Sequence, residues 1–598
     1  MHTVTILPTG KTLNAPRGAS LRDLLQKEGL VLDYPCGGKG NCRQCRLTVD
    51  PPPASGKGAL PASETDRGVR LACQTIVEAD CTLTIPEERL SAKVWKQGLR
   101  ERDIEVALHD GLVSRRGESL PQPSLEDQRA DWERLSSHLA SQGISTGGFD
   151  MPAVERISGI LRGSGFRFQT ILEDSRLLWV ARSPEERFYG IAVDLGTTTV
   201  DMALLDLETG ERLGRRTLLN RQVSFGADVV SRAQSFHADR GPVRRAALDT
   251  IGEGAHLLLS EAGVRPQQVL KTVVAGNPVM IHILNGIDPY QLTLVPYAPV
   301  ISGPVQGRPS DYSWDFQAQG TVETLPLISA YVGADTVAMI VSLDLERERR
   351  TTLNLDIGTN GEMVLSHGGR LVSTSTAAGP AFEGAGISCG MRAMDGAVYE
   401  VAVAADGSLS CTVVGGTAPK GVCGSGLVAC VARLLEQGLI DATGRLLEPC
   451  EAEGNPLRSR LFLRGKETAF ALSDDRSVFL SQQDIRRLQL AKGAVRTGLE
   501  TLLQEVGVGR EDLEEVRLAG NFGAGLDARA AMRIGLIPAM DPARVKVVGN
   551  AALRGAVLAL LSADHRRRAE GAARATRNLE LGGKPEFQMR FAESMMFD

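Results

Sequence analysis

The sequence predicts a multidomain α/β protein with a small β-rich domain at the N-terminus and a large α/β region that runs to the C-terminus. Its 598 residues are enough for about four structural units at roughly 150 residues each. From Tyr189 onward, apolar strands that end in Gly, Thr or Asp turns alternate with amphipathic helices, which is typical of α/β folds. Two segments of this region, IAVDLGTTTV at 191–200 and LNLDIGTNGE at 353–362, resemble each other. Duplicated halves are therefore expected.

Composition divides the chain into four parts. Residues 1–88 contain the strand patterns VTIL, CRLTV and CTLTI around one short helical pattern, so we expect a small β-rich domain. Residues 89–120 are polar and charged and contain proline, which is typical of a linker. Two helical patterns and then two strand patterns in 121–187 predict a small α+β domain. Residues 188–598 form the α/β region.

The overall composition is that of an ordinary globular protein. Hydrophobic residues make up 42%, charged residues 23%, and the formal net charge is -5, so no basic excess attracts nucleic acid. No apolar run approaches the ~20 residues that span a bilayer, and the start MHTVTILPTGK lacks the pattern of a secretory signal. We therefore expect a cytoplasmic protein with reduced cysteines and no membrane or nucleic-acid partner.

Four cysteines have the spacing of a metal site. Cys36, Cys42 and Cys45 are separated by five and then two residues in PCGGKGNCRQC, and Cys73 follows in RLACQT. Four thiolates suit tetrahedral zinc or an iron–sulfur cluster. A zinc ribbon has two CxxC knuckles, whereas here one CxxC follows a glycine-rich loop whose N–H groups can approach bridging sulfides. The pattern favours an iron–sulfur cluster for electron transfer, with zinc as the alternative.

Several other features have an ordinary structural interpretation. The remaining cysteines lack ligand spacing and are expected to be small core residues; they are Cys81, Cys389, Cys411, Cys423, Cys430 and Cys450. The basic segment at 565–577 is expected to be a solvated helix face. The glycine-rich segments at 377–390 and 421–427 either line a cleft or merely join strands.

Two acidic turns are candidates for phosphate binding, because each follows an apolar strand. The first contributes Asp194, Gly196, Thr197, Thr198 and Thr199, and the second contributes Asp356, Gly358, Thr359, Asn360 and Gly361. Glycine lets backbone N–H groups reach phosphate oxygens, and the threonine hydroxyls add donors. Each aspartate can hold Mg²⁺ directly or through water. We therefore expect Asp194 and Asp356 to lie at a phosphate site with Mg²⁺; the alternative for each turn alone is an ordinary strand-ending turn.

These motifs resemble those of two known groups. The cysteine segment is similar to 2Fe-2S ferredoxins, which implies a β-grasp fold over 1–88, although the first gap is five residues rather than the four of the plant type. The two acidic turns resemble the phosphate motifs of the ATPase superfamily of actin, sugar kinases and heat-shock ATPases (ASKHA), which implies an ATPase site with Asp194 and Asp356 as its catalytic residues. LAGNFGAGLD at 518–527 resembles that superfamily's adenosine motif and assigns Gly520, Asn521, Phe522 and Gly523 to the nucleotide.

The order of these parts resembles the reductive activators of corrinoid-dependent methyltransferases. Segments at 220–232, 275–289, 376–391 and 482–498 carry the resemblance over nearly the whole chain. It implies an enzyme that uses ATP, Mg²⁺ and a 2Fe-2S cluster to return an inactive Co(II) corrinoid protein to Co(I), with electrons from a low-potential donor.

The same resemblance implies a homodimer formed through 121–187 and a docking surface near 220–300 that includes Asn220, Phe225 and His282. A single histidine such as His282 is, however, more often a satisfied core or surface residue than a docking residue. No cysteine follows Cys450, which excludes the subtype with C-terminal 4Fe-4S motifs. The methyl donor of the system cannot be read from the sequence.

Three other functions stay open at this point. A small-molecule kinase with an appended ferredoxin domain would use a cleft aspartate as general base. A redox-sensing ATPase switch would report oxidation of the cluster without reducing a partner. An ATP-driven reductase of acyl thioesters is the third, although such proteins bridge two ATPase subunits with their cluster.

Overall fold

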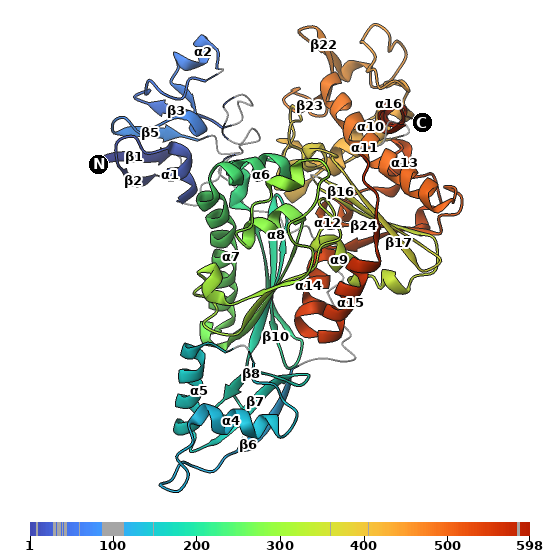
Figure 1. Ribbon diagram of the computed structural model, residues 1–598. Coiled ribbons are helices and arrows are strands. Elements are labelled where there is room, and N and C mark those ends of the chain that lie inside the picture. Colours follow the sequence, from blue (N-terminus) through green and yellow to red (C-terminus); the bar gives the residue numbers. More distant parts are fainter. Residues whose placement is uncertain are drawn as a thin grey trace.

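The computed structural model describes residues 1–7, 10–27, 32, 38, 40, 45–58, 60–85, 113–147, 149–358, 360–404, 406–582 and 586–597. Figure 1 shows an elongated molecule: the N-terminal domain lies beside α6 and α7, the small α+β domain lies at the opposite end, and two larger lobes make up the rest. No helix of the described residues is both long and apolar enough to cross a membrane. Cys36, Cys42 and Thr359 lie outside the described residues.

The N-terminal domain is a five-stranded sheet in the order β2-β1-β5-β3-β4 with one helix against it. Its elements are β1 (His2–Leu7), β2 (Lys11–Ala15), α1 (Leu21–Lys27), β3 (Arg46–Asp50), α2 (Ala62–Thr65), β4 (Val69–Leu71) and β5 (Cys81–Thr84). β1 pairs parallel with β5 and antiparallel with β2. Alternate residues such as Val4, Ile6 and Leu83 are buried, as expected when one face of a sheet covers a core.

The small α+β domain starts earlier than the sequence suggested. Its sheet contains β6 (Ser114–Ser119), β7 (Arg167–Glu173) and β8 (Arg176–Ala181), packed with α4 (Asp131–Ala140) and α5 (Met151–Gly163). β6 pairs antiparallel with β7, so 114–119 is not part of a linker as predicted. The segment SRRGES is polar because β6 is an edge strand on which most residues are exposed, as is common for sheet edges. Its two half-buried residues are paired: Arg115 Nε donates to Glu208 at 3.1 Å, and Glu118 lies 2.8 Å from His138 Nε2.

The two lobes have equivalent sheets. Lobe 1 has the strand order β11-β10-β9-β12-β14-β13 and lobe 2 has β25-β24-β15-β16-β17-β26. In lobe 1 the hairpin β9–β10 pairs parallel with β12 through β9, and in lobe 2 the hairpin β15–β16 pairs parallel with β24 through β15. The predicted duplication is confirmed by this matching topology.

The elements of lobe 1 are β9 (Tyr189–Leu195), β10 (Thr199–Asp206), β11 (Arg212–Leu219), η2 (Arg221–Phe225), α6 (Val229–Ala238), α7 (Arg240–Ala262), β12 (Val269–Gly276), α8 (Pro278–Leu284), β13 (Val305–Gly307), β14 (Thr321–Thr324) and α9 (Ala334–Ser342). Those of lobe 2 that the site uses are β15 (Thr352–Ile357), β16 (Gly361–His367), β17 (Arg370–Thr376), η7 (Pro380–Glu383), β18 (Ala397–Val403), β19 (Leu409–Val413), α10 (Gly424–Glu436), α11 (Gln482–Val506), β24 (Glu515–Ala519), α12 (Gly520–Ala524), β25 (Val545–Gly549), β26 (Arg577–Asn578) and α16 (Glu586–Met595).

The chain returns to lobe 1 after β25. α14 (Ala551–Leu561) packs against α9, β9 and β12, and α15 (Ala563–Ala575) follows beside α9 (Figure 1). Part of α15 is not the solvated basic face that the sequence suggested. Arg566 pairs with Glu173 at 2.7 Å and thereby joins α15 to the small α+β domain, whereas Arg567 stays largely exposed.

Candidate functional site

The first acidic turn is held by buried amide side chains. Asn277 Nδ2 donates to Thr197 Oγ1 at 3.0 Å, and Asn220 Nδ2 donates to the Gly196 carbonyl at 2.8 Å. A Cβ on Gly196 would lie 2.8 Å from the carbonyl oxygen of Thr199, so only glycine fits this tight turn. Asp194, at the end of β9, accepts a hydrogen bond from Asn550 Nδ2 at 2.9 Å. Asn550 caps α14, so α14 is tied directly to the first turn.

The second acidic turn touches the adenosine motif. The Gly358 N–H donates to the Asn360 carbonyl at 2.8 Å within the turn. Gly520 has a φ of +76°, and a Cβ there would lie 2.3 Å from Asp356 Oδ1. The glycine therefore allows α12 to begin directly against the Asp356 carboxylate. The Phe522 ring packs on Phe382 of η7, with ring centroids 4.8 Å apart.

Four carboxyl groups from the two lobes influence one another: Asp194, Asp335, Asp356 and Glu362. Burial raises the pKa of Asp356 to about 7, and the neighbouring Asp335 adds to the effect. Burial also raises the pKa of Asp335 to about 6, and raises the pKa values of Asp194 and Glu362 well above their usual range. Such a set of acidic oxygens fits Mg²⁺, which is commonly held by one or two carboxylates together with phosphate and water. In the described part of the chain no three His, Cys, Asp or Glu side chains are grouped so that they could hold a metal ion by themselves, so phosphate and water would have to complete the coordination of Mg²⁺.

Sequence reasoning missed Asp335, Glu362 and Glu383. Asp335 lies in the first turn of α9. Its only signal in the sequence was the GAD at 333–335, where an apolar segment leads into this helix. Glu362 was part of the quoted second segment. Glu383 lies in the glycine-rich segment 377–390, and its Oε2 accepts from Thr198 Oγ1 at 2.9 Å, so this segment lines the cleft. By contrast, Gly424 of the segment 421–427 packs under η7, where a Cβ would lie 1.7 Å from the Phe382 carbonyl oxygen.

Two residues expected on the docking surface are buried instead. Asn220 and His282 have no exposed surface. His282 Nδ1 lies 2.7 Å from the Pro278 carbonyl, and Nε2 accepts from the Val300 N–H at 3.2 Å, so the imidazole is a satisfied core group. Phe225 is 8% exposed, and the Arg22 guanidinium of the N-terminal domain lies 5.1 Å from its ring. The prediction that Asn220 and His282 contact a partner is therefore wrong.

Two of the four predicted cluster ligands are described, and they lie together. Cys45 is buried, and a hydrogen bond with the Cys73 side chain lowers the pKa of the Cys45 thiol to about 7. Gly38 and Gly40 have φ values of +87° and +78°; a Cβ on Gly38 would lie 3.8 Å from Cys73 Cβ, and one on Gly40 would overlap Gln74. Glycines close to a pair of thiols, of which Cys45 has a lowered pKa, fit a thiolate-bound cluster.

The other cysteines divide by burial. Cys423 and Cys430 are buried in the core of lobe 2, as predicted. Cys81, Cys389 and Cys411 are half-buried beside a core. Cys450 is exposed, so the expectation that it is a core residue is wrong.

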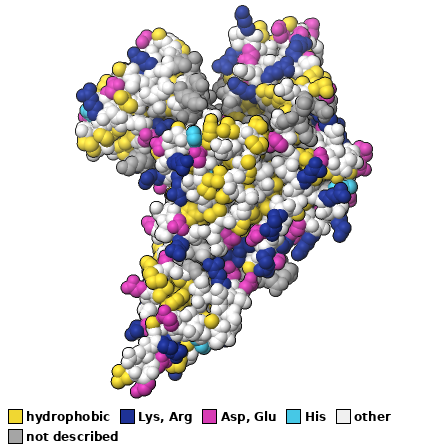
Figure 2. All heavy atoms as spheres, in the orientation of Figure 1, with side chains coloured by type: hydrophobic (Ala, Val, Ile, Leu, Met, Phe, Trp, Pro, Cys, Tyr) yellow, Lys and Arg dark blue, Asp and Glu magenta, His cyan; other side chains and the backbone are white. Residues whose placement is uncertain are grey.

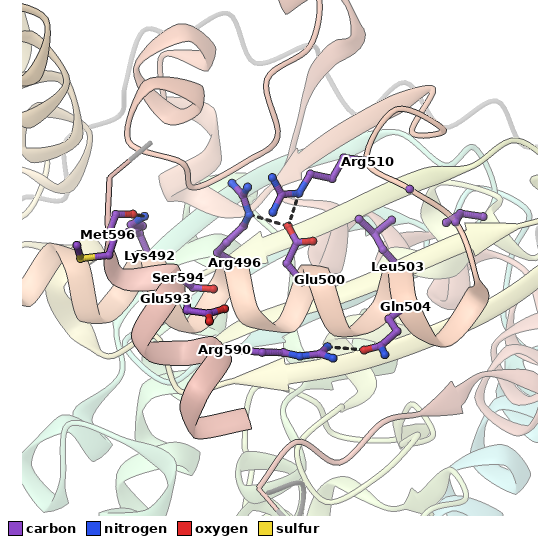
Figure 3. Close-up of a pocket in the computed structure, with 12 residues that line it drawn as sticks. Lys492, Arg496, Glu500, Leu503, Gln504, Arg510, Arg590, Glu593, Ser594 and Met596 are labelled. Atoms are coloured by element: carbon purple, nitrogen blue, oxygen red, sulfur yellow. Dashed lines mark hydrogen bonds and ion pairs between the residues drawn. The ribbon is translucent and has the colours of Figure 1, made fainter. Parts of the chain in front are cut away.

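A separate pocket of about 430 Å³ lies between α11 and α16 (Figure 3). Several of its polar side chains bind one another. Glu500 accepts from Arg496 and Arg510, both at 2.7 Å, and Arg590 donates to Gln504. The opposite face of α11 packs behind the second turn, where a Cβ on Gly361 would lie 3.2 Å from Val495. The acidic turns therefore lie outside this pocket.

Comparison with known protein families covers most of the chain. Residues 4–78 match the 2Fe-2S iron-sulfur cluster binding domain, 106–186 the RACo linker region, 189–348 the RACo middle region, and 350–598 the C-terminal ASKHA domain of RACo. The chain therefore has a 2Fe-2S-binding domain joined to an ASKHA domain.

Individual relatives agree with these matches. The chain is 30% identical to the corrinoid activation enzyme RamQ of Eubacterium limosum over 96% of this chain and 95% of that protein. It is 27% identical to the [Co(II) methylated amine-specific corrinoid protein] reductase of Methanosarcina barkeri over 58% of this chain and 66% of that protein. A solved structure of a reductive activator for corrinoid,iron-sulfur protein is 31% identical, with a TM-score of 0.72, over 100% of this chain and 98% of that chain. The chain belongs to the family of ATPase-type reductive activators of corrinoid proteins.

Proposed function

We propose that this protein is an ATP-dependent corrinoid protein reductase. Cys36, Cys42, Cys45 and Cys73 would hold a 2Fe-2S cluster that would supply one electron for the conversion of the partner's Co(II) to Co(I), and ATP and water would be converted to ADP and phosphate. One observation carries the proposal: a cysteine-bearing domain packs, through Arg22 and Phe225, on the lobe that carries the first acidic turn. Electron donor and nucleotide site are thus built on one scaffold.

Each predicted site residue has a role in this proposal. Cys36, Cys42, Cys45 and Cys73 hold the 2Fe-2S cluster, which supplies one-electron chemistry when bound. Asp194 and Asp356 hold Mg²⁺, directly or through water, with Asp335 beside them. The N–H groups and hydroxyls of the two acidic turns bind phosphate oxygens, and residues 520–523 bind adenosine. Burial of these carboxyls lets them release protons when Mg²⁺ and nucleotide bind.

A physical need for ATP follows from the potentials. A ferredoxin-type cluster has a potential of about −400 mV, and a Co(I) corrinoid is a stronger reductant, so transfer is uphill. For an assumed gap of ~200 mV the deficit is roughly 5 kcal/mol, since each ~59 mV of a one-electron couple is about 1.4 kcal/mol. A conformational step driven by ATP supplies that free energy.

Exposed apolar residues on lobe 1 support a docking surface for the corrinoid protein. Leu294, Val295 and Val300 are 41%, 79% and 57% exposed. Figure 2 shows hydrophobic side chains gathered on the face of lobe 1 below the N-terminal domain. An exposed apolar patch rimmed by polar groups is typical of a protein interface. This segment takes the place of Asn220 and His282 in our proposal.

The remaining proposals rest mainly on the sequence. We propose that a low-potential donor reduces the protein, that it forms a homodimer through the small α+β domain, and that it is cytoplasmic. We also propose domain boundaries near residues 88, 113 and 188. Sedimentation velocity of the full chain and of Leu125→Asp, which alters a residue that is 87% exposed on that domain, tests the dimer.

The test of the function separates its two parts. With a cognate corrinoid protein and a low-potential donor, Cys45→Ala should retain partner-stimulated ATP hydrolysis but lose cobalt reduction. Asp356→Asn should retain a reducible cluster but deliver no electron to cobalt. Formation of a phosphorylated small molecule would instead favour a kinase, and indifference to every corrinoid protein would favour a redox-sensing switch.

A further inference from the structure

Glu383 lies between the two acidic turns. It ends η7 of lobe 2, and its Oε2 accepts a hydrogen bond from Thr198 Oγ1 of lobe 1 at 2.9 Å. Its Oε1 lies 3.6 Å from the place that a Cβ on Gly358 would occupy. One carboxylate therefore reaches both turns. The Thr198 hydroxyl has only one proton to donate, so a phosphate oxygen bound there would compete with this carboxylate for it. The two anions would also repel each other.

The neighbour of Glu383 contacts the adenosine motif. Phe382 packs on Phe522, and its carbonyl lies against Gly424 of α10, so its backbone is fixed. Gly379 and Gly386, on either side, have positive φ values with open space around them. The backbone of Phe382 is thus held in place, whereas the segment 379–386 that contains Glu383 has a glycine with open space around it at each end.

A buried guanidinium on which the Glu383 carboxylate acts electrostatically lies on α6. Arg232 has no exposed surface. Its Nε donates to the Gly226 carbonyl at 2.8 Å, and its Nη1 lies 3.5 Å from Met280 Sδ. Its Nη2 has no hydrogen-bond partner among the described residues. A buried guanidinium with an unused donor is unfavourable unless an anion approaches it.

Glu383 is one of the anions that act on Arg232. Burial lowers the pKa of Arg232 to about 9, while the carboxylates of Asp228 and Glu383 oppose that shift. Asp228 is already engaged, since its Oδ1 accepts from the Ser231 N–H at 2.8 Å as the cap of α6. Of the two carboxylates that act on Arg232, Glu383 is therefore the one whose hydrogen-bond donor, the Thr198 hydroxyl, is also expected to bind phosphate.

We propose that Glu383 distinguishes nucleoside triphosphate from diphosphate by exchanging partners. The γ-phosphate takes the Thr198 hydroxyl, and the displaced Glu383 carboxylate pairs with Nη2 of Arg232. This proposal rests on the ATP site of the proposed function and names the residue that reads the γ-phosphate there. The exchange makes and breaks no covalent bond; only hydrogen bonds and an ion pair change.

The exchange reaches the N-terminal domain. Arg232 also binds the carbonyl of Gly226, and Gly226 follows Phe225, on whose ring Arg22 of the N-terminal domain lies. α1 of that domain contacts η2. Pairing of Arg232 with Glu383 therefore changes the forces on the loop that seats the cluster-bearing domain.

The test is a double-mutant cycle on nucleotide affinity in the full chain. Dissociation constants of a non-hydrolysable ATP analogue and of ADP, each with Mg²⁺, are measured by calorimetry for wild type, Arg232→Met, Glu383→Gln and the double variant. Arg232→Met should weaken the ATP analogue at least about tenfold and leave ADP within about twofold, because the displaced carboxylate then lacks the guanidinium that would receive it. In the double variant the neutral amide needs none, so affinity for the ATP analogue should return to within about threefold of wild type.

Glu400→Gln is the matched control, since Glu400 also accepts a hydrogen bond from a threonine hydroxyl, Thr412, at 3.3 Å, but on the exposed hairpin β18–β19. It should change neither constant. Equal loss for both nucleotides in Arg232→Met, or an additive cycle, overturns the exchange. Wild type that binds neither nucleotide overturns the proposed function itself.

Hydrogen exchange on wild type is a second measurement that does not depend on folding of Arg232→Met. The ATP analogue should change protection in both 220–235 and 379–386, whereas ADP should not. Glu383→Gln should abolish that difference. The same protection with both nucleotides contradicts the proposal.

Discussion

The two acidic turns have the same backbone topology but different anchors. In lobe 1, Asp194 is bonded to Asn550 at the start of α14, and the turn is bonded to Asn220, which precedes η2. In lobe 2, Asp356 lies against Gly520 of the adenosine motif. The first turn is thus connected to η2, which the N-terminal domain contacts, and the second to α12, which we propose to bind adenosine. In our proposal both turns bind phosphate, the first also links the nucleotide site to the N-terminal domain, and the second holds the nucleotide.

The largest expected effect is common to both turns. Asp194→Asn and Asp356→Asn should each lower the turnover number for ATP hydrolysis by about 10²-fold or more, because each removes a charge that holds Mg²⁺ at the phosphates. Both variants should keep the absorbance spectrum of the cluster. Full hydrolysis by Asp194→Asn alone would show that only the lobe 2 turn is catalytic.

The next effect separates the anchors. Gly520→Ala places a Cβ 2.3 Å from Asp356 Oδ1 at a φ of +76°, so it should destabilise the protein by at least about 1–2 kcal/mol and impair nucleotide binding. Asn550→Ala removes a helix cap and should cost about 1 kcal/mol, with weaker nucleotide binding through Asp194. Urea unfolding and nucleotide titration of each variant provide the measurement. If Gly520→Ala and Asn550→Ala weakened ADP binding equally, the two turns would not differ in their roles as we propose.

The pH dependence of stability should report the second turn. The pKa of Asp356 is raised to about 7, so the folded protein binds a proton there more tightly than the unfolded chain does. Its contribution to the free energy of unfolding is full below about pH 4 and is lost as pH rises towards 7, by a few kcal/mol, since each pKa unit is about 1.4 kcal/mol. Without Mg²⁺, Asp356→Asn should reduce this loss relative to wild type. Identical pH profiles for the two proteins would show that the carboxyl is not buried in solution.

The smallest effect concerns the seat of the N-terminal domain. Arg22→Ala removes a cation–π contact with Phe225, worth roughly 0.5–1 kcal/mol at an exposed site. We expect little change in the melting temperature of the lobes but faster hydrogen exchange in 221–226. Arg17→Ala, on the same domain, is the control. Unchanged exchange in Arg22→Ala would mean that the first turn is not connected to that domain.

The sequence predicted what is local and missed what depends on distant contacts. The acidic turns and the cysteine loop are contiguous, so apolar strands, glycines and spacing identified them. Asp335, Glu383 and Asn550 reach the cleft from separate segments, and their proximity exists only after the lobes fold. Arg566 seemed solvated because its partner Glu173 belongs to another domain. For His282 the alternative of a satisfied core residue is the one that the structure bears out, and its partner, the Val300 N–H, lies in a different loop that the local sequence does not reveal.

The measurement that tests the central claim most directly is the Co(I) absorbance band of a cognate corrinoid protein. It is followed after mixing with this protein and a low-potential electron donor under anaerobic conditions, with and without ATP. Our account predicts that the band appears only with ATP and is absent with Cys45→Ala. Equal formation of Co(I) without nucleotide would contradict the account, because the two lobes would then play no part in driving the electron.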